Sequence, residues 1–201
     1  SAKLGMLPAD QTPTPVLTSA SLLVNGLPVQ QAPVGQSGLR VRIVGAQLRA
    51  DTQVLINGVV TISHLEGPDV FVELDENPAI KNSAGPLLVR ARNTTPTPSN
   101  LSNELDAGRL VGPEITRVKV KKKAAGALLL KIFGVNFPSA GTVVVMANGA
   151  QLPIQSSFFE PPDFAQAKIS AAAAPAPGTT MTIRLVTSQG IQSNEFTAVA
   201  K

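Results

Sequence analysis

His64 is the only histidine in the chain, so a Ser–His–Asp catalytic arrangement would have to use it. It lies in the stretch TISHLEGPD, directly after an expected strand. Because no nucleophile-elbow motif accompanies it, we expect a surface or loop residue without a catalytic role. The chain also has no cysteine, which excludes disulfide bonds, thiolate catalysis and zinc–thiolate sites.

Five carboxylates lie close together in the sequence, at Glu66, Asp69, Glu73, Asp75 and Glu76. Carboxylate pairs can perform acid–base chemistry, and carboxylate clusters can bind Ca²⁺. The spacing here does not match a calcium-binding loop. Alternation directs Val70, Val72 and Leu74 inward and Glu73 outward, so we favour a solvated strand face followed by a turn. A weak cation site between Glu66 and Glu76 is the alternative.

The most distinctive charge feature is the run RVKVKKK, which begins at Arg117. On a strand, Val118 and Val120 would share one face, and the other face would carry a basic stripe of Arg117, Lys119, Lys121 and Lys123. The stripe could contact an anion on a nucleic acid, an acidic glycan or a membrane. We favour the alternative that lysines on an exposed first strand prevent edge-to-edge pairing. Nucleic acid is disfavoured because interleaved aromatic residues and a recognition helix are missing.

The composition limits the other kinds of site. An apolar content of 43% is sufficient for a packed core, and no apolar run is long enough to predict a transmembrane helix. The 7 Phe are accompanied by no Trp and no Tyr, the rings on which sugars usually stack. The one aromatic pair, Phe158-Phe159, is expected to pack in the core, the alternative being that one of its rings lies at a domain face. We therefore expect no catalytic residue, no cofactor and no metal site.

The two halves of the chain differ in charge. Residues 1–107 contain 7 Lys+Arg and 9 Asp+Glu, a net charge of −2. Residues 108–201 contain 10 and 4, a net charge of +6. This asymmetry indicates two units and makes the second half the one expected to meet an anion.

The sequence also repeats itself. SNEL, which begins at Ser102, returns as SNEF at Ser193, and four earlier segments return in the same order. They pair PVLTSASLLV with PEITRVKVKK, LRVRIVGAQL with LLLKIFGVNF, TQVLINGVV with TVVVMANGAQ, and GPLLVRARN with GTTMTIRLV. The shared order indicates one fold written twice. Short strands with turns every 8–12 residues predict an antiparallel sandwich in each half.

Several local expectations follow from the same repeats. Asn57-Gly58 and Asn148-Gly149 predict tight turns with a strand directly after each, because both residue types tolerate positive φ. The continuous run Val143–Val145 predicts a strand buried on both faces. Residues 70–82 alternate like a strand. Residues 165–170 predict a strand, and residues 171–177 predict a loop, because their prolines would end a helix.

The domain boundaries follow from composition. We expect a lead-in or linker over residues 1–12, one domain over 13–108 and a second over 109–201. The short connection DAGRLVGPE predicts end-to-end domains with limited bending. The first copy takes 30 residues from Pro15 to Gly45, whereas the second takes 21 from Pro113 to Gly134. We expect the additional stretch NGLPVQQAPVGQSG to form a hairpin or a long loop.

These repeated features resemble the IPT/TIG domain, the immunoglobulin-like fold shared by plexins and some transcription factors. The resemblance is carried by four features that occur once in each half. The first two are the Asn-Gly turns and the prolines that open a strand, Pro15 and Pro113. The others are the Gly-x-x-hydrophobe steps, Gly45–Leu48 and Gly134–Phe137, and the closing strands with Ser102-Asn103 and Ser193-Asn194. It implies an all-β fold of two tandem immunoglobulin-like antiparallel β-sandwiches. It also implies a spacer or interaction role, as in receptors, bacterial surface proteins and polysaccharide-active enzymes.

From these observations we expect a non-catalytic structural or interaction module of a larger bacterial cell-surface or secreted protein. Such a module would space domains or mediate adhesion, outside the cell, with a protein or cell-surface partner that the sequence does not identify. Its mechanism would be rigidity, because each sandwich buries a core between sheets about 10 Å apart. The main alternative is an accessory carbohydrate-binding module of a polysaccharide-active enzyme. A DNA-binding, transcription-factor-like role is a third hypothesis.

Overall fold

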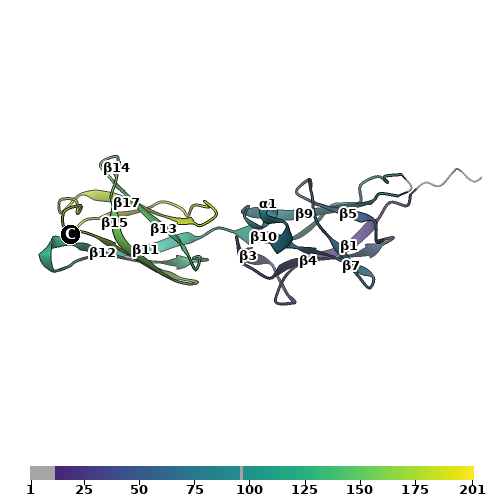
Figure 1. Ribbon diagram of the computed structural model, residues 1–201, viewed down its shortest axis with the longest axis horizontal. Helices are drawn as coiled ribbons and strands as arrows, with labels where there is room; N and C mark the ends of the chain where they lie inside the picture. Colours follow the sequence, from purple (N-terminus) through teal and green to yellow (C-terminus); the bar gives the residue numbers. More distant parts are fainter. Residues whose placement is uncertain (1–11, 96) are drawn as a thin grey trace, which may run out of the picture. The chain divides into compact units, whose positions relative to one another are not determined.

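The computed structural model describes residues 12–95 and 97–201, so the expected lead-in over 1–12 lies outside the described residues except for Thr12. The chain forms two compact units, unit 1 ending at Leu110 and unit 2 beginning at Val111. Each unit has its own hydrophobic core. Figure 1 labels the elements of both units.

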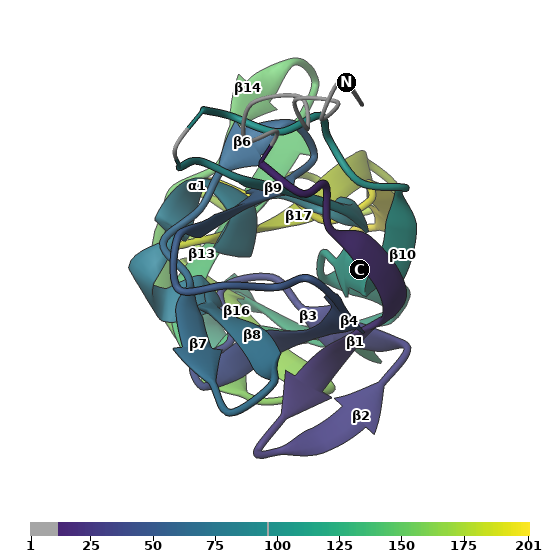
Figure 2. The ribbon, with the colours of Figure 1, turned by 90° about the vertical axis from the view of Figure 1, so that its right-hand side faces the viewer.

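Unit 1 is built from ten strands and two short helices. The strands are β1 (Val16–Val24), β2 (Leu27–Val29), β3 (Gln31–Pro33), β4 (Leu39–Ala46), β5 (Thr52–Ile56), β6 (Val59–Val60), β7 (His64–Glu66), β8 (Asp69–Glu73), β9 (Gly85–Asn93) and β10 (Leu105–Val111). The helices are the 3-10 helix η1 (Leu74–Glu76) and α1 (Pro78–Lys81). The strands form two sheets, with the orders β2-β1-β4-β8-β7 and β3-β10-β9-β5-β6. Figure 2 shows the layer of β1, β4 and β8 below the layer that contains β9.

Unit 2 has eight strands in two four-stranded sheets. The strands are β11 (Glu114–Lys122), β12 (Leu128–Val135), β13 (Gly141–Ala147), β14 (Ala150–Gln151), β15 (Ile154–Glu160), β16 (Phe164–Ile169), β17 (Thr180–Thr187) and β18 (Phe196–Val199). A 3-10 turn, η2 (Ala124–Gly126), joins β11 to β12. The orders are β11-β12-β16-β15 and β14-β13-β17-β18.

Both units are immunoglobulin-like β-sandwiches, which confirms the expected fold class. In this fold the first, second, fifth and fourth principal strands form one sheet, and the third, sixth and seventh form the other. Unit 2 follows that order, with β14 added next to β13. Unit 1 follows it too once β2 and β3 are set aside. The two halves therefore share one topology.

Alternating side chains fill each core. In β12, Leu128, Leu130 and Ile132 point inward and are at most 1% exposed, while Lys131 lies on the outer face. The expectation that Val143–Val145 is buried on both faces is wrong. Val143 and Val145 are buried but the middle valine is half-buried, because its sheet has one face on the core and the other toward solvent.

The Asn-Gly turns are confirmed. Asn57 and Gly58 have φ of 53° and 79°, and Asn148 and Gly149 have φ of 50° and 79°. Both turn residues are thus left-handed, as a two-residue hairpin requires. The strand that follows each turn is only two residues long.

The additional stretch of the first copy, expected to form a hairpin or a long loop, begins as a hairpin. A third Asn-Gly turn at Asn25 and Gly26, with φ of 51° and 80°, joins β1 to β2. The chain then moves to the opposite sheet, where β3 lies beside β10. The insertion therefore covers the outer edge of β1 in one sheet and of β10 in the other.

The expected strand over residues 70–82 ends early, at Glu73. The remaining residues form η1 and α1 instead. Asn77 causes the change of direction, because its side chain accepts from Ile62 N (2.9 Å) and donates to the carbonyl oxygens of Ile62 and Glu73. Pro78 then occupies the first helical turn, where its missing N–H is not needed.

The repeated Ser-Asn pairs do not lie in the closing strands, which corrects the expectation. Ser102-Asn103 and Ser193-Asn194 lie in the connections that precede β10 and β18. Each Asn side chain hydrogen-bonds to the backbone N–H and carbonyl of one residue in the first strand of its unit, as a neighbouring strand would. Asn103 accepts from Leu17 N (2.9 Å) and donates to Leu17 O (3.0 Å). Asn194 makes the same two bonds to Ile115, at 2.6 and 2.9 Å.

The serines hold the opposite sheet. Ser102 exchanges two bonds with Ala91 of β9, its N–H donating to the carbonyl (2.8 Å) and its Oγ accepting from the amide (2.9 Å). Ser193 makes the same exchange with Leu185 of β17, both at 2.9 Å. Each Ser-Asn pair, called the Ser-Asn clamp below, therefore ties the first strand of one sheet to a central strand of the other.

A glycine lies across from each clamped residue. Leu17 faces Gly45 and Ile115 faces Gly134, beside a bulge in the first strand. A Cβ at Gly45 would overlap the carbonyl oxygen of Val16, and one at Gly134 would overlap that of Glu114. The Gly-x-x-hydrophobe step is thus required by the close approach of two strands.

Candidate functional site

His64 is a surface residue, as expected. It begins the short strand β7, is exposed, and its Nε2 lies 2.9 Å from Glu76 Oε2. Its side-chain hydrogen-bond partner is thus a solvent-exposed carboxylate on the 3-10 helix η1. This geometry assigns His64 to a surface pair.

The acidic stretch is compensated by cationic side chains. Arg40 pairs with Glu66 and Glu73, and Arg42 Nη2 lies 2.6 Å from Asp69 Oδ2. Lys81 pairs with Asp75, and together with an N–H bond from Gly38 it lowers the pKa of that carboxyl. Four of the five carboxylates are thus paired with Arg or Lys, and the fifth, Glu76, contacts the imidazole of His64. Among residues 12–95 and 97–201, no group of three His, Asp or Glu side chains forms a metal-binding cluster.

The stretch is less solvated than alternation predicted. Val70, Val72 and Leu74 are buried, as expected. Asp69 is also buried, at 7% exposure, because Arg42 covers it. Glu66, Asp69 and Glu73 therefore form ion pairs with β4 on the outer face of the sheet of unit 1, while Asp75 and Glu76 lie on η1.

The basic run forms most of the expected stripe. Strand β11 covers residues 114–122, and Arg117, Lys119 and Lys121 are exposed on its outer side while Val120 is buried. Lys123 follows the end of the strand and has an extended backbone. The strand order places β11 at the edge of its sheet.

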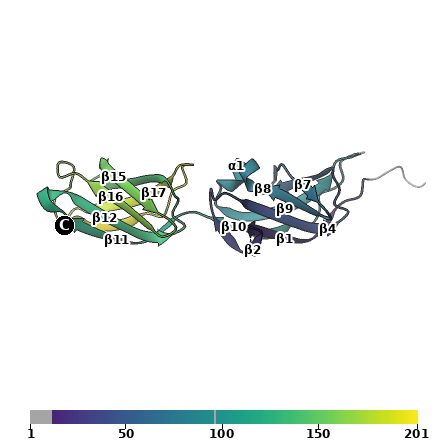
Figure 3. The same cartoon turned by 60° about the horizontal axis from the view of Figure 1, so that its bottom comes forward.

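Lysines on neighbouring strands widen the stripe into a face. Lys119 is directly opposite Lys131 of β12, and Lys121 is opposite Leu129, which in turn faces Lys168 of β16. Figure 3 shows β11, β12, β16 and β15 side by side on this side of unit 2. We call this surface the basic face, which consists of Arg117, Lys119, Lys121, Lys123, Lys131 and Lys168.

The basic face has no carboxylate partners among the described residues. The ion pair found in the described part of unit 2 is Arg184–Glu195, on the other sheet. The cations instead contact an aromatic ring: Arg117 Cζ lies 4.3 Å, and Lys119 Nζ 5.7 Å, from the centroid of Phe133. Phe133 also packs against Phe164, with centroids 5.3 Å apart. One end of the face is thus covered, and the lysines of the other end are free to bind.

That other end is hollowed. An open depression of about 540 Å³ is lined by Lys123, Lys131 and Lys168, together with Leu129, Gln166 and two alanines. Gln166 is paired across the strands with Phe158, whose side chain is 54% exposed. Phe159 points the other way and packs against the core. The expectation of core packing is therefore confirmed for Phe159, and Phe158 is the ring of the pair that lies at a face, because consecutive residues of a strand face opposite sides.

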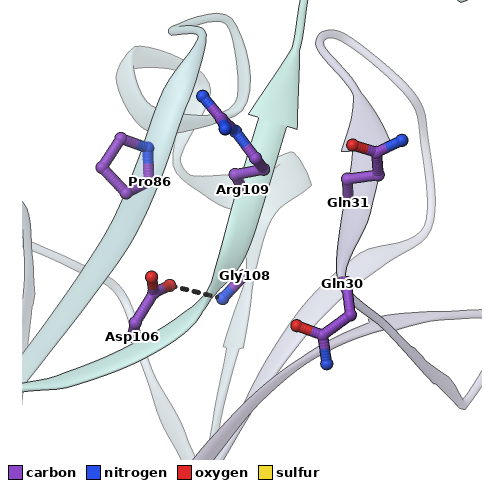
Figure 4. A pocket seen from close by; sticks show the side chains of 6 residues that line it. All are labelled: Gln30, Gln31, Pro86, Asp106, Gly108 and Arg109. Atoms are coloured by element: carbon purple, nitrogen blue, oxygen red, sulfur yellow. Dashed lines mark hydrogen bonds between the residues drawn. The ribbon is translucent and has the colours of Figure 1, made fainter.

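A second depression, of about 460 Å³, lies in unit 1 where β3 meets β10. Figure 4 shows Gln30 and Gln31 across from Asp106 and Arg109. Asp106 accepts a bond from Gly108 N (2.8 Å), and Arg109 N donates to the carbonyl oxygen of Gln30 (3.0 Å). The side-chain amides and the guanidinium can still donate outward, so this depression can hydrogen-bond a polar ligand.

Sequence reasoning missed Lys131, Lys168 and Gln166. Each is the polar outward residue of an apolar strand, in LLLKIF and AQAKI, which was the available signal. Their association with the stripe depends on the strand register, which sequence spacing alone does not provide.

Comparison with known proteins identifies no family for this chain. No protein-family model matches the sequence, and no curated protein matches it. Similar solved structures include bovine butyrophilin (TM-score 0.35, 10% identity, 94% of this chain and 98% of that one). They also include a tandem from titin (0.43, 10%, 84% and 60%) and a domain segment of intimin (0.29, 13%, 90% and 97%). The strand order described above, and not these loose superpositions, assigns the immunoglobulin-like fold.

No helix in the described part of the chain is long and apolar enough to cross a membrane.

Proposed function

We propose that the chain is a non-catalytic interaction module of a larger bacterial cell-surface or secreted protein, made of two IPT/TIG domains over residues 13–108 and 109–201. It spaces neighbouring domains and presents binding surfaces. One observation carries this proposal: the Ser, Asn and Gly residues that the two halves share hold the fold, whereas the charged residues on the outer faces differ between the halves.

The shared residues support a scaffold role. The Ser-Asn clamps and the glycines opposite them all contact backbone of their own unit. None of these polar groups is left over for a reaction. The outer faces carry ion pairs in unit 1 and unpartnered lysines in unit 2, as expected when one scaffold is duplicated and its surfaces are adapted separately.

Protease treatment of intact producing cells tests the location. An antibody against the purified chain would follow the parent protein in cells and in the culture medium. We expect cleavage on intact cells, or release to the medium, while a cytoplasmic control protein stays intact. Protection of the parent protein until the cells are lysed would contradict the proposal.

The second candidate is an accessory carbohydrate-binding module, and the depression at Gln30, Gln31, Asp106 and Arg109 favours it. Amide, carboxylate and guanidinium groups at an open surface match the hydroxyl groups of a neutral sugar. A glycan array with neutral polysaccharides is the test. Binding that is lost in Gln31→Ala and Arg109→Ala would favour this candidate, and the absence of any neutral ligand would remove it.

A further inference from the structure

We infer that the basic face of unit 2 binds an acidic polysaccharide, with the carboxylate or sulfate groups of the ligand on Lys123, Lys131 and Lys168 and its sugar rings near Gln166 and Phe158. This goes beyond the proposed function, because binding by the purified chain does not depend on where the parent protein resides.

Edge protection does not explain the face. Lysines on an exposed edge strand prevent sheet-to-sheet pairing, and Lys119 and Lys121 on β11 fit that explanation. Lys131 and Lys168 lie on β12 and β16, which are the two inner strands of the sheet. Inner strands already have both neighbours, so their lysines need another explanation.

The arrangement of charges on the basic face also destabilises the folded sheet. Lys119 and Lys131 are directly opposite each other, and like charges in that relation destabilise a sheet. On the equivalent face of unit 1, the corresponding pair is Ser21 opposite Arg42, so this repulsion is absent. There Arg40 is opposite Glu73, at the position that corresponds to Leu129 opposite Lys168. Unit 2 has a lysine where unit 1 has the acid, which leaves the charge available to an external anion.

The spacing suits a polymer with repeated charges. Adjacent strands lie about 4.8 Å apart, and alternate residues of one strand lie about 7 Å apart, so the ammonium groups form a grid rather than a cage. A small single anion would meet few of them at once. A chain of acidic sugars can meet several, and its affinity then depends on salt.

The surroundings favour a polysaccharide over other polyanions. Single strands of nucleic acid stack successive bases on several aromatic rings. Among the described residues of this face, Phe133 is covered by Arg117 and Lys119, which leaves the single ring of Phe158 exposed. Next to the lysines, Gln166 supplies amide groups for sugar hydroxyls, and exposed Phe158 supplies an apolar surface for a sugar ring. The hollow at Lys123, Lys131 and Lys168 can hold such a chain, whereas a lipid surface is flat.

Binding measurements on the purified chain test the inference. The probes are polygalacturonate and heparin, with dextran as a neutral polymer, single-stranded DNA of 20 nucleotides, and vesicles containing phosphatidylserine. We expect binding to at least one acidic polysaccharide at 50 mM NaCl, weaker binding at 200 mM NaCl and none to dextran. The double variant Lys131→Gln/Lys168→Gln should lose at least tenfold in affinity, and Lys131→Arg/Lys168→Arg should retain it.

A matched control separates the face from net charge. Lys122→Gln/Arg184→Gln removes the same charge from the same unit but from positions off the face, since Arg184 lies on β17 of the other sheet, and its affinity should change less than twofold. The Lys131→Gln variant should melt at the same or a slightly higher temperature, since a repulsive pair is removed. No binding at 50 mM NaCl, equal losses in the control, or tighter binding to DNA or vesicles would each overturn the inference.

Discussion

The outer faces of the two equivalent sheets differ in how their charges are arranged. In unit 1, Arg40 and Arg42 on β4 have acidic partners on β7 and β8. In unit 2, Lys131 takes the position of Arg42 and no acid faces it. Since the cores and strand orders agree, the difference shows that face charge is independent of the fold. It determines which unit can attract an anion.

The sheet edges differ as well. The insertion of unit 1 places β2 against β1 and β3 against β10. In unit 2, β11 and β18 occupy the corresponding positions and have no further strand beside them. Exposed lysines on β11 protect one of these edges. Unit 1 thus protects its edges with additional chain, whereas unit 2 protects β11 with charge.

The glycine opposite each clamp gives the largest expected effect. In Gly134→Ala, the new Cβ would overlap Glu114 O and the ring of Phe137, and we expect unit 2 to lose about 3–4 kcal/mol of stability. Gly45→Ala meets backbone only at Val16 and Leu17 and should cost unit 1 about 2–3 kcal/mol. Urea unfolding followed by circular dichroism measures both, because the chain has no Trp or Tyr. Small losses of stability in both variants would contradict the close approach of the strands at these two glycines.

The clamps themselves come next. Asn194→Ala and Asn103→Ala each remove two hydrogen bonds to the first strand, so each unit should lose about 1–2 kcal/mol. Hydrogen exchange should show faster exchange of the Ile115 or Leu17 amide in the corresponding variant. Asn100→Ala, at an exposed loop position, serves as the control. If the two clamp variants differ by more than about twofold in cost, the halves are not equivalent at this point.

Acid should affect unit 1 through Asp51. Hydrogen bonds from the Thr95 hydroxyl and from the Thr95 and Thr94 amides, with Arg49 nearby, lower the pKa of Asp51 to about 2. A carboxyl whose pKa is lowered by folding stabilises the protein above its unfolded value of 3.8, and this contribution is lost as the pH falls toward 2.

We therefore expect Asp51→Asn to lose about 1–2 kcal/mol at pH 7, a figure reduced for the partial exposure of the side chain. The difference in the free energy of unfolding between this variant and the natural chain should disappear as the pH falls from 4 to 2. Urea unfolding at pH 7, 4 and 2.5 measures it, with Glu104→Gln, from an exposed ion pair, as the control. A gap that persists unchanged at pH 2.5 would show that the charge of Asp51 is not the cause.

The smallest expected effects on stability come from substitutions of the two equivalent cations, Arg42 and Lys131. Arg42→Gln leaves the buried Asp69 without its partner and should lower the stability of unit 1 by about 0.5–1 kcal/mol. Lys131→Gln removes repulsion and should leave unit 2 unchanged or raise its stability by a few tenths of a kcal/mol. Calorimetric melting of both variants at 20 mM salt gives the signs. The same sign for both would remove the contrast between the faces.

The repeat and the alternation of the strands were enough to predict the fold class and the tight turns at Asn57 and Asn148. These features depend on neighbours in sequence, because φ preference and side-chain direction are local properties. The helical segment after Glu73 was missed, since its turn is fixed by the bonds of Asn77 to Ile62, fifteen residues away.

By itself the sequence determined two duplicated β-sandwiches, a positive second half and the stripe on the strand that begins at Glu114. The tertiary structure alone decided that the Ser-Asn pairs are clamps, that the acids of residues 66–76 are compensated, and that Lys131 and Lys168 join the stripe. The physical reason is register: strand pairing brings together side chains tens of residues apart, and a shift of one residue would send each of them to the opposite face.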